Sequence, residues 1–424
     1  MGIVSRVRAV LRFWRSRIPL WRMFFGVVGV LFALQAATVA VLSIIVARRR
    51  EQRRPIRGFP YLTLPEVGVG TNRLRIYSYG DELYDAMIAA IESAKERIYF
   101  ETYLWKDDEV GRRFKERLHR KALEGVEVYV IFDGFGNLVV DRAFKQFPPE
   151  IRTMRYRAIQ RFAHIFDPRR YALDHRKLLV VDGRIAFIGG YNIGNLYATE
   201  WRDTHLRIRG QAAADLADSF LEFWNSHSHR KQRIQRRYGR RFDPLINIKS
   251  NDALRLTFPI RDMYIEAIDQ AERYILLTNA YFIPDHTVLS ALKAAVARGV
   301  DVQVLLPWTS NHILADWAAR GYFTDCLKGG IRIFGYKRAM VHAKTCTIDG
   351  QWSTIGTANL DRLSSIGNYE INMEIYSPEL ARQMEDIFAC DKTNAFELTL
   401  DQWIKRPWYV EMSEQILAPL RLML

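Results

Sequence analysis

The chain has 424 residues, enough for two ordinary domains or one large two-part domain, and 49% of them are hydrophobic, so a sizeable core can form. Its 62 lysines and arginines exceed its 47 acidic residues, and the net charge of +15 indicates an anionic partner, either nucleic acid or a membrane with acidic lipids. Three cysteines without C-x2-C spacing argue against a disulfide framework and a zinc site, and they favour a reducing compartment.

Residues 23–47 form a 25-residue run without a charged side chain, between a basic tail at 1–22 and a basic linker at 48–70. At 1.5 Å per residue, the run can cross a hydrocarbon core about 30 Å thick. It is longer than the apolar core of a signal peptide, so we expect one retained transmembrane helix. Six arginines lie close on each side, which leaves the orientation open, and the free cysteines favour a cytoplasmic catalytic part.

Helical and strand patterns alternate after the linker. The near-identical segments GVEV at 125–128 and GVDV at 299–302 indicate corresponding strands in the two halves. This rhythm predicts an α/β fold of helix-covered mixed β-sheets, built by internal duplication. Helices are expected at 81–95, 110–123, 262–270 and 288–297, and strands at 98–104, 126–132, 274–277 and 300–306.

We expect a first lobe at 71–245, a second lobe at 246–395, and an amphipathic, membrane-proximal segment at 396–424. The lobes meet near a basic stretch at 230–241 that holds seven cations. This stretch can be a solvated segment or a contact for lipid headgroups, and the sequence leaves both open.

Two stretches, 167 residues apart, share one spacing at six positions. Lys follows His by two residues, Asp by seven, Gly by fourteen, Asn by seventeen and an acidic residue by twenty-eight. A single His-x-Lys arises by chance in many chains, but agreement at this many positions indicates a duplicated functional site. The positions are His175, Lys177, Asp182, Gly189, Asn192 and Asp203 in the first copy, and His342, Lys344, Asp349, Gly356, Asn359 and Glu370 in the second.

The spacing also predicts local geometry. Side chains two apart on a strand point the same way, so each His lies beside its Lys. Asp182-Gly183 and Asp349-Gly350 predict tight turns into second strands at 185–188 and 353–355. A pseudo-twofold pairing of the two halves would bring both copies into one site. Although Asp182 and Asp349 belong to the catalytic motif, we expect them to support the hairpins or the lysines.

Two imidazoles, two ammonium groups and two carboxamides suit a phosphate diester. One histidine can attack phosphorus while the other protonates the leaving alcohol, and we assign these roles to His175 and His342, respectively. Asp203 and Glu370 are the candidates to orient the two imidazoles. No cluster suggests a metal, and we expect no cofactor. The groups expected to bind the phosphate oxygens are Lys177, Lys344, Asn192 and Asn359.

These residues resemble the two HKD motifs of the phospholipase D superfamily, from about residue 70 to the C-terminus. The chain is most similar to bacterial cardiolipin synthases, in the phrases GGYNIG at 189–194, EWRDTH at 200–205, YFIP at 281–284 and GTANLDR at 356–362. The resemblance implies a two-lobed α/β fold, a phosphohistidine intermediate and no metal. Gly190 and Thr357 stand where the superfamily often has Ser, so we expect Gly190 to remove one hydroxyl contact with phosphate.

The resemblance further implies phosphatidyl transfer. One phosphatidylglycerol would give its phosphatidyl group to a histidine and release glycerol, and the hydroxyl of a second lipid would then displace the histidine to form cardiolipin. The acceptor could be phosphatidylglycerol or phosphatidylethanolamine. The expected partners are anionic phospholipid and the bacterial inner membrane, and no nucleic acid. Two alternatives remain: a membrane-tethered phosphodiesterase that hydrolyses phospholipid or nucleic acid, and a non-catalytic lipid-binding scaffold.

Overall fold

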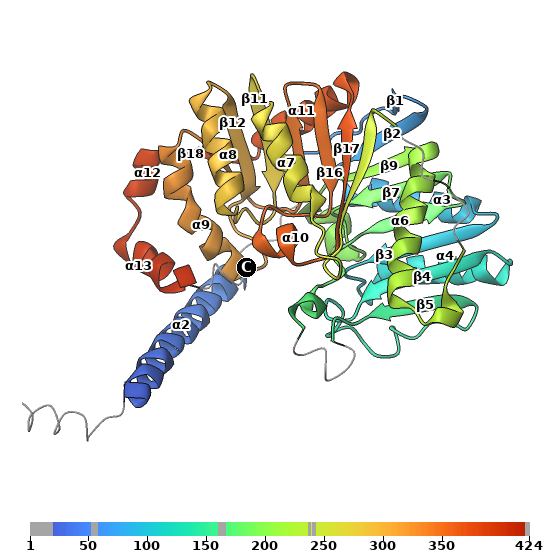
Figure 1. Ribbon diagram of the computed structural model, residues 1–424, viewed down its shortest axis with the longest axis horizontal. Coiled ribbons are helices and arrows are strands. Elements are labelled where there is room, and N and C mark those ends of the chain that lie inside the picture. The colour runs from blue at the N-terminus through green and yellow to red at the C-terminus, as the bar shows by residue number, and fades with distance from the viewer. Residues whose placement is uncertain (1–19, 52–57, 160–166, 236–238, 240–242, 420–424) are drawn as a thin grey trace, which may run out of the picture.

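The computed structural model describes residues 20–51, 58–159, 167–235, 239 and 243–419. Two eight-stranded sheets, one from each half of the chain, stand beside each other with helices packed against them (Figure 1). The strand orders are β1-β2-β9-β7-β6-β3-β4-β5 and β10-β17-β16-β15-β11-β12-β13-β18. Both sheets contain parallel and antiparallel pairs, so the predicted α/β class with mixed, helix-covered sheets is confirmed.

The first half builds its sheet around strands whose apolar residues are buried on both faces. The strands are β1 (Val67–Val69), β2 (Asn72–Tyr77), β3 (Arg97–Thr102), β4 (Glu127–Asp133), β5 (Ile151–Tyr156), β6 (Leu178–Val181), β7 (Ile185–Gly189) and β9 (His205–Arg209). The helices are α3 (Gly80–Ser93), α4 (Glu109–Leu123), α5 (Asn195–Thr199) and α6 (Gln211–His227), with short 3-10 turns η2 (Pro168–Tyr171) and η3 (Arg230–Gln232).

The second half repeats the pairing: β11 lies between β12 and β15, as β3 lies between β4 and β6. Its strands are β10 (Ile246–Asn251), β11 (Tyr274–Asn279), β12 (Asp301–Pro307), β13 (Arg332–Tyr336), β15 (Lys344–Ile348), β16 (Trp352–Gly356), β17 (Glu370–Tyr376) and β18 (Ala395–Leu398). Its helices are α7 (Pro259–Asp269), α8 (His286–Ala297), α9 (Ile313–Lys328), α10 (Arg362–Ile366), α11 (Pro378–Lys392), α12 (Leu400–Ile404) and α13 (Trp408–Leu417). The elements expected at 81–132 and 262–306 all occur, within three residues of the expected bounds.

The two sheets share one hydrophobic core. Ile188 and Leu206 of the first sheet belong to the same buried cluster as Ile355, Ile371 and Met373 of the second. Alternating strand residues place these side chains on the facing sides of the two sheets. Continuous packing therefore fixes the position of one lobe against the other.

Helix α2 (Leu20–Glu51) projects away from the lobes (Figure 1). It is attached by a hydrogen bond from Gln35 Nε2 to the Ile416 carbonyl (3.3 Å) and by packing of Val39 near Trp317 and Leu417. In the part of the chain that the structure describes, no helix is both long and apolar enough to cross a membrane, so the span expected at 23–47 is not confirmed. Residues 1–19 of the basic tail, 52–57 of the linker, and 236–238 and 240–242 of the basic stretch lie outside the described residues.

Candidate active site

Each motif histidine precedes a buried β-hairpin, β6–β7 or β15–β16. The predicted turns are present: Asp182 and Gly183 have φ of 51° and 64°, and Asp349 and Gly350 have φ of 55° and 70°, the left-handed values that a two-residue hairpin turn needs. Each aspartate lies at the end of its strand opposite the histidine, so neither position supports a direct catalytic role.

Both turn aspartates bind the backbone of the neighbouring strand, as expected for hairpin support. The Asp182 carboxylate accepts three N–H bonds of 2.7–2.8 Å, and that of Asp349 accepts three of 2.8–2.9 Å. This arrangement ties each hairpin to the start of β3 or β11. The donors are Lys95, Glu96 and Arg97 for Asp182, and Glu272, Arg273 and Tyr274 for Asp349.

The backbone of each histidine is hydrogen-bonded to the opposite lobe. The His175 N–H donates to the Tyr369 carbonyl (3.1 Å), and the His342 N–H donates to the Arg202 carbonyl (2.7 Å). Beside His342, β14 (Met340–Val341) pairs in parallel with β8 (Trp201–Arg202) of the first lobe. Each histidine therefore lies against the segment that carries the acidic residue of the other motif copy.

The side chains cross between the lobes in the same way. His175 Nδ1 lies 2.9 and 3.0 Å from the two carboxylate oxygens of Glu370, and His342 Nδ1 lies 2.7 Å from Asp203 Oδ2. When a carboxylate accepts the Nδ1 proton, the neutral imidazole has its lone pair on Nε2. Both imidazoles are thus held by their inner nitrogen, which leaves Nε2 for chemistry at phosphorus.

The lysines and asparagines of the motif are buried in the same region. Lys177 Nζ donates to the His175 carbonyl (2.6 Å), and Lys344 Nζ donates to the His342 carbonyl. The Asn192 side-chain oxygen accepts the N–H of Leu104 (3.2 Å). Among the described atoms, the buried Asn359 side-chain oxygen has no hydrogen-bond partner, so this carboxamide retains unused bonding capacity.

Electrostatic interactions join the two motif copies into one site. Burial lowers the pKa of both histidines well below the usual value, and the charges of Lys177 and Lys344 lower it further at each. His175 also lowers the pKa of His342. Burial lowers the pKa of Lys177 to about 7 and that of Lys344 to about 8. An anionic phosphate diester would favour the charged form of all four groups.

Aromatic rings beside the histidines were not among the predicted site residues. The Tyr103 ring centroid lies 4.9 Å from that of His175, and the Trp201 and Tyr281 centroids lie 5.2 and 6.3 Å from that of His342. Trp201 and Tyr281 stand within conspicuous sequence phrases, which could have identified them. Tyr103 carries no such signal, because it lies outside those segments, within an apolar run expected to be a strand.

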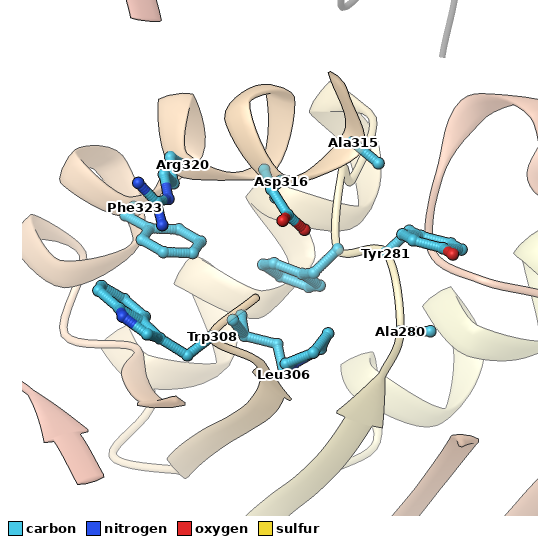
Figure 2. Close-up of a pocket in the computed structure, with 11 residues that line it drawn as sticks. Ala280, Tyr281, Leu306, Trp308, Ala315, Asp316, Arg320 and Phe323 are labelled. Carbon is cyan, nitrogen blue, oxygen red and sulfur yellow. The ribbon is translucent and has the colours of Figure 1, made fainter. Parts of the chain in front are cut away.

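Tyr281 also borders a small cavity between α9 and the ends of β11 and β12 (Figure 2). The lining is largely apolar and includes Phe282, Leu306, Trp308 and Phe323. Its volume of about 10 Å³ is that of a single water position. An acyl chain does not fit in this cavity.

The two positions where Ser was expected contact the carboxylates. Thr357 Oγ1 donates to Glu370 Oε2 (2.5 Å), so this hydroxyl supports the acid that holds His175. A Cβ atom at Gly190 would lie 2.1 Å from Asp203 Oδ1, so only glycine leaves room for that carboxylate. The hydroxyl of Thr357, the residue that matches Gly190, donates to Glu370, and the loss of a phosphate contact at Gly190 stays a prediction.

The sequence model of the family described as "Cardiolipin synthase, PLD-like domain" matches residues 87–224 and 264–392, which hold both motif copies. The chain belongs to the cardiolipin synthase family. The cardiolipin synthase of Listeria monocytogenes is 32% identical over 371 residues, and the major cardiolipin synthase ClsA of Bacillus subtilis is 30% identical over 368. Each alignment covers 81% of this chain and 74% of the relative, so the resemblance seen in the motifs is confirmed.

A solved structure shows the same fold outside the curated synthases. The crystal structure of phosphatidylserine synthase from Haemophilus influenzae matches with a TM-score of 0.62 at 16% identity, over 89% of this chain and 97% of that one. At this identity the match shows the fold alone. The two-lobed arrangement described above therefore also occurs in that protein.

Proposed function

We propose that the protein is a cardiolipin synthase that forms cardiolipin and glycerol from two phosphatidylglycerol molecules through a phosphohistidine. The observation that carries this proposal is the pair of imidazoles in one buried site, each held at Nδ1 by a carboxylate of the opposite lobe. Two such histidines can divide the work of nucleophile and acid–base catalyst. The names of the curated relatives supply the lipid substrate.

In the first step, His175 Nε2 attacks phosphorus and the bond from phosphorus to the glycerol oxygen breaks. His342 Nε2 gives its proton to that oxygen, so glycerol leaves neutral. The Asp203 carboxylate stabilises the imidazolium before this transfer, as the acid of a Ser-His-Asp triad does. We assign the attack to His175 because its side chain is 13% exposed, against 5% for His342, and it is therefore the easier for a diester to reach.

In the second step, a hydroxyl of a second phosphatidylglycerol attacks the phosphohistidine. His342, now neutral, takes the hydroxyl proton as the phosphorus–nitrogen bond breaks, and cardiolipin is released. Water at the same position would give phosphatidic acid, so exclusion of water selects transfer over hydrolysis. Lys177, Lys344 and the two motif asparagines would bind the non-bridging oxygens in both steps.

The proposal places the enzyme on the bacterial plasma membrane with anionic phospholipid as its partner. Residues 23–47 would provide the anchor, since Phe25, Val30, Val41 and Ile44 of α2 are all more than half exposed to solvent in the isolated chain. The C-terminal segment at 396–424 would lie near the bilayer, because α13 packs on α2 and exposes Trp408 and Tyr409. Aromatic residues of this kind favour the membrane–water interface.

The test is a product analysis with the purified full-length protein, phosphatidylglycerol vesicles and a metal chelator. We expect cardiolipin and glycerol in equal amounts, and no product from His175→Ala or His342→Ala. Lipid labelled in the phosphatidyl group should leave acid-labile label on the protein. Phosphatidic acid as the sole lipid product would identify a hydrolase, and unchanged lipid would reject the proposed substrate.

A further inference from the structure

The first lobe presents three exposed apolar side chains on the loop that follows β4. Phe135, Leu138 and Val139 are 61%, 60% and 87% exposed, and Val139 has the largest exposed fraction among the large apolar side chains in the described part of the chain. Single exposed apolar residues are ordinary, but three within five positions form a patch.

The base of this loop is fixed by buried polar groups. Asp133 Oδ1 accepts the N–H groups of Phe135 and Gly136, both at 2.7 Å. Asn137 Nδ2 donates to the carbonyls of Tyr103 (2.7 Å) and Asp133 (2.8 Å). Because Asp133 and Asn137 are each 1% exposed, the loop is anchored at its base while its apolar side chains remain in solvent.

The loop lies next to the catalytic site on the first lobe, and α10 lies next to it on the second. The Tyr103 segment that binds Asn137 also places its ring against His175. On the second lobe, burial raises the pKa of Glu370 to about 8, and Ser364 of α10 is among the groups that partly offset this rise, so α10 lies beside that acid. The same helix exposes Leu363 and Ile366, each 43%. Exposed apolar side chains therefore lie on segments beside the site in both lobes, and α10 lies on the side from which α2 projects (Figure 1).

We propose that these five side chains form an apolar rim that enters the bilayer surface, so that the catalytic site opens directly onto lipid. The apolar rim comprises Phe135, Leu138, Val139, Leu363 and Ile366. This inference rests on the proposed function, because the occupant is the anionic bilayer that holds the substrate.

Three observations favour that occupant. Arg142 and Arg362, which are exposed beside the two parts of the rim, supply charge that complements acidic headgroups. The cavity beside Tyr281 is too small for an acyl chain, so this cavity does not hold the chains of a bound lipid. Helix α10, which carries two rim residues, also lies on the side of the molecule from which α2, the proposed anchor, projects (Figure 1).

Fluorescence quenching tests the rim without measuring catalysis. Full-length Cys390→Ser protein carrying Val139→Cys is labelled with an environment-sensitive dye and bound to phosphatidylglycerol vesicles with brominated acyl chains. Cys326 and Cys346 are buried and should stay unlabelled. The control is Leu123→Cys at the end of α4, which is 64% exposed and outside the rim. We expect strong quenching at 139 and little at 123; equal quenching at both positions would overturn the proposal.

A kinetic test links the rim to catalysis. Leu138→Ser with Val139→Ser should lower turnover of vesicle substrate about tenfold, since removing two apolar side chains weakens interfacial binding. Turnover of a soluble short-chain phosphatidylglycerol should not change, and Leu123→Ser should behave as wild type on both. Equal loss on both substrates, or no loss on either, contradicts the rim. If wild-type protein converts neither substrate, the proposed function fails while the quenching result still decides the rim.

Discussion

The two motif copies form two half-sites, one around His175 and one around His342. They have the same backbone arrangement but differ in how the carboxylate is held. Glu370 meets His175 with both oxygens and accepts the hydroxyl of Thr357, whereas the shorter Asp203 meets His342 with one oxygen. At the position that matches Thr357, Gly190 leaves space for the Asp203 carboxylate. The duplicated site therefore keeps the contact between Nδ1 and an acid, and it reaches that contact with two different residue pairs.

The residues just before the acids differ as well. Arg202 Nε and Nη2 donate to the two carboxylate oxygens of Asp391 at 2.9 and 2.8 Å, and both side chains are 1% exposed. The matching Tyr369 hydroxyl lies 3.2 Å from His227 Nε2. Both contacts join the lobes behind the site, one as a buried ion pair and the other as a neutral hydrogen bond.

The largest effect is expected from the histidines. His175→Ala and His342→Ala should each lower turnover by roughly 10³- to 10⁴-fold, because water replaces neither the nucleophile nor the acid. A phosphatidyl ester of nitrophenol separates the two roles, since this leaving group departs without a proton. His342→Ala should release nitrophenol in a burst and His175→Ala should not. The opposite pattern would exchange the assigned roles.

Breaking the buried ion pair should be the next largest effect. Asp391→Ala should lower the free energy of unfolding by about 3–5 kcal/mol, because it leaves the Arg202 charge buried and unpaired. Tyr369→Phe should lower it by only about 1 kcal/mol. Denaturant titration of the full chain in detergent measures both. Asp401→Ala, which breaks an exposed pair with Lys405, is the matched control, with an expected change below about 1 kcal/mol. Equal changes for Asp391→Ala and Tyr369→Phe would remove the distinction between the two contacts.

The glycine of the first half-site provides a sharper comparison. Gly190→Thr copies the residue of the other half-site, yet its Cβ would meet the Asp203 carboxylate at 2.1 Å. Displacing the acid, and with it His342, by about 1 Å should lower kcat about 10²-fold. Combining Gly190→Thr with Asp203→Ala, which removes the obstructing carboxylate, should cost no more than Asp203→Ala alone. A fully active Gly190→Thr single variant would show that the two half-sites tolerate the same residues.

A change at Thr357, the matching position of the other half-site, should lower activity less. Thr357→Val removes one hydrogen bond to a buried acid and leaves its space filled, at a cost of about 1.5–3 kcal/mol in support of Glu370. We expect roughly a tenfold loss in kcat with little change in KM. Thr357→Ser keeps the hydroxyl and should retain most of the activity. If Val and Ser variants are equally impaired, the methyl group rather than the hydroxyl supports the acid.

The smallest effect concerns pH. Burial lowers the pKa of Lys177 to about 7 and that of Lys344 to about 8, so both lose their charge as pH rises through this range. Because the charged forms bind phosphate, kcat/KM should fall on the alkaline side, beginning near pH 7. Lys177→Arg keeps its charge at all relevant pH values and should move that fall upward toward pH 8. An alkaline limb that does not move in Lys177→Arg would assign it to another group.

The hairpins of this site could be predicted from sequence, but the contacts between the two lobes could not. Asp-Gly turns and the apolar run at 178–181 fix the hairpins within a few residues, so His175 and His342 could be placed just before buried strands. The spacing of the motif does not decide whether each histidine is oriented by the acid of its own lobe or of the other. Only the packing of the two sheets places Glu370 beside His175. The ring of Tyr103 reaches the site for the same reason, through tertiary packing that leaves no local pattern.

The exchange of acids between the lobes makes the two repeats chemically inseparable. Neither lobe by itself contains a histidine with its own orienting carboxylate, so an isolated half would hold two unmatched parts of different dyads. A substitution at residue 370 alters the reactivity of an imidazole in the other repeat. The two repeats can therefore diverge in sequence elsewhere. At this site, a substitution in one repeat affects the histidine or the acid of the other.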